Sequence, residues 1–108
     1  MASTKYLVTD EIKLDIENVT KYLREVLLNP QAAKQLIDDL HKTVENIVIF
    51  PNSRPALEEV FIQDCPVRKA IIKGYILYYI YDENAGLVTF LRFVSVKRDN
   101  DSVIRHLS

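Results

Sequence analysis

The chain has 108 residues, 48% of them hydrophobic, and its 14 basic side chains nearly balance 15 acidic ones. This length suits one compact domain spanning residues 1–108, because domains commonly run to about 100–150 residues. A net charge of −1 argues against a surface that binds a polyanion on every side, since such binding depends on Lys and Arg. The charge is uneven, however: residues 1–65 hold 7 basic and 11 acidic residues, a net −4, and residues 66–108 hold 7 and 4, a net +3.

The sequence shows no feature of a membrane or secreted protein. Its longest apolar stretches fall far short of the roughly 18 residues that a membrane-spanning helix needs. The amino terminus lacks the charged-then-apolar layout of a secretory signal, and a lone cysteine, Cys65, suits a reducing compartment. His41, His106 and Cys65 are too few and too scattered for a metal site of the usual spacing. We therefore expect a cytoplasmic protein with no membrane contact, no metal and no other cofactor.

The chain begins with a predicted strand that runs into a helix. Residues 5–9 are a short run of strand formers, and Thr9 or Asp10 can accept hydrogen bonds from the free amides of a helix start. Apolar residues then recur three and four positions apart, which predicts an amphipathic helix ending near Leu28. These residues are Ile12, Ile16, Val19, Leu23, Val26 and Leu27.

A second helix is expected to begin immediately afterwards. Asn29 can cap it, and Pro30 suits the first helical position, where its missing N–H is not needed. A second apolar stripe continues until Phe50-Pro51, where the proline ends the helix. The stripe consists of Ala33, Leu36, Ile37, Leu40, Val44, Ile47 and Val48. Two long helices joined this tightly must form an antiparallel hairpin.

The rest of the chain predicts strands. Residues 51–66 contain three prolines and are expected to be mostly loop, with a short apolar patch at Val60–Ile62. Three runs rich in Ile, Val, Tyr and Phe follow and predict an antiparallel meander, namely Val67–Lys73, Tyr75–Tyr81 and Leu87–Val96. Residues 99–107 predict a short helix or a tail. The expected fold is α+β in the order β-α-α-β-β-β, with the helix hairpin packed on one face of a small antiparallel sheet.

This order and spacing resembles a known superfamily of bacterial toxins. The segments that carry the resemblance are NPQAAKQLIDDLHKTVENIVIFP at 29–51, VRKAIIKGYILYYIYDE at 67–83 and FLRFVSVKRD at 90–99. Together they look like the RelE/ParE superfamily of type II toxin-antitoxin modules, and the match covers nearly the whole chain. The resemblance implies a toxin that arrests bacterial growth and is neutralised by a cognate antitoxin wrapped around it.

The superfamily divides by target, and the closing basic residues bear on that division. RelE-like members are ribosome-dependent endoribonucleases that cleave mRNA, in which Lys and Arg stabilise charge at the scissile phosphate. ParE-like members keep the scaffold and poison DNA gyrase. Arg98 stands where RelE-like members place a catalytic arginine, with Lys97 beside it, but Ile76 and Ile104 stand where an arginine and a tyrosine are common. The incomplete nuclease set favours gyrase over the ribosome, and a degenerate, non-toxic interaction module is a further alternative.

Basic side chains of the second half are the candidate functional residues. As a ribonuclease, the protein would use Arg98 and Lys97 as catalytic residues, with Lys69 or Lys73 assisting. For contact with a protein target or nucleic acid the candidates are Arg68, Lys69, Lys73, Arg98 and Arg105. Strand alternation is expected to place Lys69 and Lys73 on one face and Arg68 on the other.

Charged and aromatic residues within the strands favour structural roles. Arg92 lies in mid-strand between Leu91 and Phe93, so we expect it to form a salt bridge with an acid of the helix hairpin. Alternation also places most tyrosines of the central strand in the core, with Tyr75, Tyr79 and Tyr81 on one face and Tyr78 on the other.

Two surfaces are candidates for the antitoxin. Antitoxins of the superfamily present a helix or a strand, so an apolar groove between the helix hairpin and the sheet could receive one. Val60, Phe61 and Ile62 are candidate antitoxin-binding residues, with core burial as the alternative. A toxin free of its antitoxin could form a homodimer through the same apolar patch.

Overall fold

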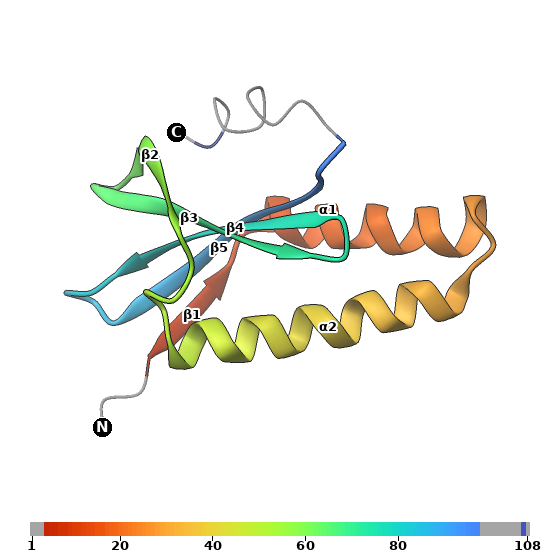
Figure 1. Cartoon of the computed structure of the whole chain (residues 1–108), viewed down its shortest axis with the longest axis horizontal. Coiled ribbons are helices and arrows are strands. Elements are labelled where there is room, and N and C mark those ends of the chain that lie inside the picture. Colours follow the sequence, from red (N-terminus) through yellow and green to blue (C-terminus); the bar gives the residue numbers. More distant parts are fainter. Residues whose placement is uncertain (1–3, 98–106, 108) are drawn as a thin grey trace.

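The computed structural model of the chain describes residues 4–97 and Leu107. A strand comes first, then a helix that ends in a π-helical turn, a second helix and four more strands (Figure 1). The elements are β1 (Lys5–Val8), α1 (Asp10–Lys21), η1 (Tyr22–Val26), α2 (Pro30–Ile49), β2 (Ala56–Ile62), β3 (Cys65–Ile72), β4 (Tyr75–Asp82) and β5 (Leu87–Ser95). Within the described residues, the helices are too short or too polar to cross a membrane.

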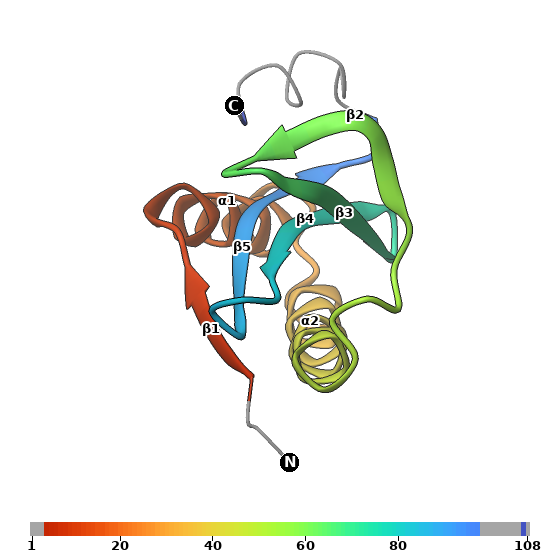
Figure 2. The same ribbon diagram turned by 90° about the vertical axis from the view of Figure 1, so that its left-hand side faces the viewer.

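The described strands form one twisted sheet in the order β1-β5-β4-β3-β2 (Figure 2). The meander of β3, β4 and β5 is antiparallel, as expected, whereas β1 pairs in parallel with β5 and makes the sheet mixed. The helices form the expected hairpin on one face of the sheet, with α1 against β5 and α2 against β3. The α+β fold predicted from the sequence is confirmed.

Both faces of the sheet carry a packed core, because side chains alternate between the faces along the strands. A register shift in the pairing of β4 with β5 places both Phe90 and Phe93 on the helix side. The core on the helix side contains Ile12, Leu36, Leu40, Ile47, Ala70, Ile72, Leu77, Tyr79, Val88, Phe90 and Phe93. The core on the far side contains Val67, Ile76, Tyr78, Ile80 and Val94, covered in part by side chains of β2 and by Leu107. Tyr75, Tyr79 and Tyr81 lie on the helix side and Tyr78 on the far side, which confirms the predicted division.

Strand β2 occupies residues 56–62 of the segment predicted to be mostly loop after α2. Its pairing with β3 is irregular, since the register shifts between Ala56 and Phe61 and Glu59 has a φ of 58°. The prolines at 51 and 55 precede the strand, and Pro66 belongs to β3, so none of them interrupts β2. The prediction of a loop was wrong because pairing with β3 and packing on the far-side core stabilise this strand, and local sequence does not report either contact.

Side chains cap both helices where the sequence predicts it. The Thr9 hydroxyl accepts a hydrogen bond from the Ile12 amide at 3.1 Å. The Asn29 side chain accepts one from the Ala32 amide, also at 3.1 Å, with Pro30 in the first turn of α2. These caps satisfy amides that have no partner inside a helix.

The turn between the helices departs from regular geometry. In η1 the Leu27 amide donates to the Tyr22 carbonyl, five residues back, at 3.0 Å. The chain then reverses at Leu28, which has a φ of 51°, and the Asn29 amide donates to the Leu23 carbonyl at 2.8 Å. This pattern ends a helix with a residue in the left-handed region, which is usually glycine because a side chain is strained there.

Candidate functional site

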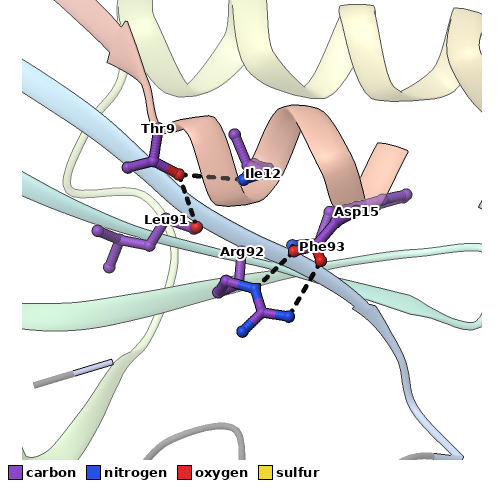
Figure 3. Close-up of polar contacts among 6 residues, drawn as sticks. All are labelled: Thr9, Ile12, Asp15, Leu91, Arg92 and Phe93. Carbon is purple, nitrogen blue, oxygen red and sulfur yellow. Dashed lines mark hydrogen bonds and ion pairs between the residues drawn. The ribbon is translucent and has the colours of Figure 1, made fainter. Parts of the chain in front are cut away.

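The first turns of α1 complete the free edge of β5. Pairing between β1 and β5 ends at Phe90, so the next part of that edge has no strand beside it. The Thr9 hydroxyl donates to the Leu91 carbonyl at 2.9 Å, and Asp15 Oδ2 accepts from the Phe93 amide at 3.0 Å (Figure 3). Side chains of α1 therefore replace strand pairing where β1 stops, and they fix α1 against β5.

Arg92 and Asp15 form an ion pair at the same joint. Arg92 Nε donates to Asp15 Oδ2 at 2.6 Å, and one of its terminal nitrogens donates to Oδ1 at 3.0 Å (Figure 3). This hydrogen bonding raises the pKa of Arg92, against the opposing effect of burial. The predicted salt bridge to the helix hairpin is confirmed. Asp15 was missed as its partner, although an acid three residues after Ile12, on the apolar stripe of α1, is the signal that could have identified it.

The structure separates Lys69 from Lys73, which were expected to share a face of the sheet, and brings Lys73 and Lys97 to one groove. Lys69 lies on the far side of the sheet, because residues two positions apart in a strand share a face and Val67 belongs to the far-side core. Lys73 lies in the β3–β4 turn with a φ of 46°, and its ammonium group is 3.5 Å from Asp39 on α2. The expectation that Lys69 and Lys73 share a face was wrong, since alternation stops where the chain turns.

Arg68 is engaged by the loop that follows α2. Its guanidinium group donates to the Arg54 carbonyl at 2.6 Å and to the Asn52 carbonyl at 3.4 Å. From the adjacent strand, the Tyr79 hydroxyl donates to the Pro51 carbonyl at 3.0 Å, and burial raises the pKa of Tyr79. Arg68 thus helps to anchor a loop in the described structure.

The remaining predicted site residues lie at two other places. Lys97 is exposed just past the end of β5, whereas Arg98, Arg105 and the predicted helix or tail before Leu107 fall outside the described residues. Val60 and Ile62 pack against the far-side core, and Phe61 between them is exposed.

A groove of about 790 Å³ opens between the end of the helix hairpin and the end of the sheet. Its walls come from α1, η1, the β3–β4 turn and the end of β5, and they are mainly apolar: Val19, Tyr22, Leu27, Tyr75, Phe93 and Val96. The Tyr75 and Phe93 rings stack with centroids 5.3 Å apart and planes 22° apart. The sequence predicted a groove between hairpin and sheet but not which residues line it.

Two titratable groups near these surfaces have a raised pKa. Burial, followed by the proximity of Tyr22, raises the pKa of Tyr75, so its hydroxyl stays neutral at physiological pH. Burial and the nearby Asp82 and Asp64 raise the pKa of the Cys65 thiol, which disfavours the reactive thiolate.

Comparison with solved structures shows the same fold in toxin-antitoxin systems. The chromosomal ParDE TA system from P. aeruginosa matches with a TM-score of 0.68 and 16% identity, over 88% of this chain and 98% of that one. The toxin-antitoxin complex RelBE2 from Mycobacterium tuberculosis matches with a TM-score of 0.57 and 15% identity, over 87% and 99%. No curated protein matches the chain. At these identities the structural matches establish the fold alone.

The family itself follows from the sequence match. The family model described as the ParE toxin of type II toxin-antitoxin system, parDE, matches residues 6–100, which include both helices, β2 to β5 and all of β1 except its first residue. This chain therefore belongs to the ParE toxin family of type II toxin-antitoxin systems, within the RelE/ParE superfamily.

Proposed function

We propose that this ParE-family toxin arrests bacterial growth by inhibiting DNA gyrase and is neutralised by its cognate antitoxin. The observation that carries the proposal is the match of the ParE family model to residues 6–100. The chain would act in the cytoplasm, where gyrase and the antitoxin are found. Inhibition requires binding and no chemical step, so the protein would not be an enzyme.

The placement of the basic residues limits which of them can act together in a ribonuclease site. A ribonuclease site needs several cations around one scissile phosphate, because they must stabilise the same developing charge. Lys69 lies on the far side of the sheet, and Lys73 reaches Asp39 on the helix side. Lys69 and Lys73 therefore do not converge on a single phosphate, whereas Lys73 and Lys97 line the same groove.

Two assays on one antitoxin-free preparation test the proposal. The purified protein is added to a gyrase supercoiling reaction with detection of cleavage complexes, and to ribosomes translating a defined mRNA. We expect gyrase inhibition with intact mRNA. Codon-positioned mRNA cleavage with active gyrase would instead establish a RelE-like ribonuclease, and the variants Arg98→Ala and Lys97→Ala would then abolish cleavage without unfolding the domain.

Expression in growing cells gives the complementary test. Growth arrest by the chain alone, relieved by co-expression of the antitoxin from the same module, is the expected result. Unimpaired growth at high expression, together with active gyrase and intact mRNA, would reject the toxin and leave a non-toxic interaction module.

A further inference from the structure

The loop between α2 and β2 brings together two arginines that have no acidic partner. Arg54 belongs to this loop and Arg68 to β3, and the guanidinium group of Arg68 donates to the Arg54 carbonyl. Among the described residues, neither side chain forms a salt bridge. The acid that reaches the loop, Glu83, accepts a hydrogen bond from the Asn52 side chain at 3.2 Å instead. Two positive charges are therefore held close together without a paired negative charge.

The side chain of Arg54 contains a donor that the fold does not use. Its Nε is buried, and it has no hydrogen-bond partner within the part of the chain that the structure describes. A terminal nitrogen of the same group contacts Asn46 Oδ1 on α2, but this contact is long, at 3.5 Å. Burying a donor without an acceptor is unfavourable, so an unpaired buried donor marks a position where a water molecule or an ion binds.

Arg68 presents further donors beside Arg54. Its bonds to the Asn52 and Arg54 carbonyls both use Nη1, so Nε and Nη2 have no hydrogen-bond partner in the described structure. Both guanidinium groups also act on the Tyr79 hydroxyl. Burial raises the pKa of Tyr79, and the positive charges of Arg68 and Arg54 oppose that rise. The two arginines thus direct their charge to one region of the loop.

The chemistry of these donors suits a phosphate group. A guanidinium group is planar and presents paired N–H donors that match the oxygens of a phosphate, and two such groups can share its negative charge. The loop carbonyls that bind Arg68 are dipoles, so they neutralise no formal charge. A bound anion would supply that charge and reduce the repulsion between the two guanidinium groups.

We propose that Arg54 and Arg68 form a phosphate-binding site on the loop after α2, in which phosphate oxygens accept from Arg54 Nε and from the unpaired nitrogens of Arg68. The ligand is inorganic phosphate or a phosphate group of a nucleotide, because both carry the same oxygens. Neither arginine lines the groove of Lys73 and Lys97, so this is a second site. The inference does not depend on the proposed toxin function.

Titration of the full chain with phosphate tests the site. Binding of inorganic phosphate and, separately, of ATP is measured by calorimetry in chloride buffer at constant ionic strength, so that screening by salt stays the same. We expect saturable binding that Arg54→Met weakens at least about tenfold and Arg24→Met changes by less than about twofold. Arg24 is the matched control, because it is an exposed arginine on η1, outside this loop.

Melting temperatures separate phosphate binding from a structural role of Arg54. A ligand that binds only the folded chain raises the melting temperature, so phosphate should stabilise the parent chain and Arg24→Met but not Arg54→Met. In chloride buffer alone, Arg54→Met should melt no lower than the parent chain, because the substitution keeps an apolar stem and removes a buried donor that has no protein partner. A purely structural role would instead lower the melting temperature of Arg54→Met in both buffers.

The outcomes identify the ligand or overturn the site. Inorganic phosphate that binds at least as tightly as ATP, with both lost in Arg54→Met, would assign the site to the free ion. Tighter binding of ATP with the same dependence on Arg54 would assign it to a nucleotide phosphate. Absence of binding, or binding that Arg54→Met and Arg24→Met weaken equally, would overturn the proposal and leave a buried water molecule as the partner of Arg54 Nε.

Discussion

The two ends of α1 differ in how completely their groups are satisfied. At its first turns, Thr9 and Asp15 bond to Leu91 and Phe93 on β5, and Asp15 also pairs with Arg92. At its other end, η1 breaks the helical pattern and Leu28 lies exposed in a strained conformation. The first end is built for stability, whereas the second retains strain and uncovered apolar surface. This difference indicates which end the fold depends on and which end is available to a partner.

Removing the Asp15 side chain should break the contacts between the first turns of α1 and β5, and it should cause the largest loss of stability. Asp15→Ala leaves the guanidinium of Arg92 and the Phe93 amide without their acceptor in a largely buried place. We expect the free energy of unfolding in urea to fall by about 3 kcal/mol. Asp10→Asn is the control. The Asp10 carboxylate is fully exposed and its ion pair with Lys13 is long, at 4.0 Å, so this substitution should change the free energy of unfolding little. Equal losses in the two variants would show that the joint does not hold α1 in place.

Thr9→Val should have a smaller effect at the same end. The substitution keeps the side-chain shape but removes both the cap on the Ile12 amide and the bond to the Leu91 carbonyl. A loss of about 1–2 kcal/mol is expected in the same urea experiment. Thr9→Ser retains the hydroxyl and should recover most of that stability, and a Ser variant as unstable as the Val variant would contradict the hydrogen-bonding explanation.

The fall in the free energy of unfolding at alkaline pH should depend on Tyr79, which anchors the loop after α2. The folded-state pKa of Tyr79 is raised above the usual 10.0, mainly by burial, so the neutral hydroxyl is favoured in the folded protein. Its contribution is full below about pH 10 and is lost as the pH rises through the folded-state pKa.

Tyr79→Phe tests this pH dependence. The variant should lose about 1 kcal/mol at neutral pH, because its bond to the Pro51 carbonyl is gone, and should show a shallower fall above pH 10. Tyr22→Phe, at the half-exposed hairpin end, should keep the neutral-pH stability of the parent chain. Parallel alkaline curves for the parent chain and Tyr79→Phe would contradict this prediction.

Relieving the strain at the hairpin end should give the smallest change, and in the opposite direction. Leu28→Gly removes a side chain from the left-handed region and should stabilise the fold by about 0.5–1 kcal/mol in urea unfolding. Leu27→Gly is the matched control, because Leu27 has a φ of −87° and glycine there should be neutral or destabilising. If both glycine variants destabilise the protein equally, the backbone at Leu28 is not strained.

Sequence reasoning succeeded where the controlling interactions are local. The helix bounds follow from apolar spacing and from caps such as Thr9 and Asn29, which act within three residues. The division of Tyr78 from Tyr79 follows from strand alternation, which holds inside β4 because that strand is paired on both sides. The need of Arg92 for an acidic partner follows from the cost of burying an unpaired charge.

Tertiary structure decided everything that depends on which distant segments meet. It created β2 by pairing it with β3, placed β1 in parallel beside β5, and separated Lys73 from Lys69 at a turn. It also selected Asp15 among the acids of the hairpin and formed the groove between η1 and the end of β5. The chain by itself determined its helices, its strand alternation and its membership of the ParE toxin family. The joints and the groove could emerge only on folding, because each needs groups from far apart in the sequence to come within hydrogen-bond or van der Waals distance.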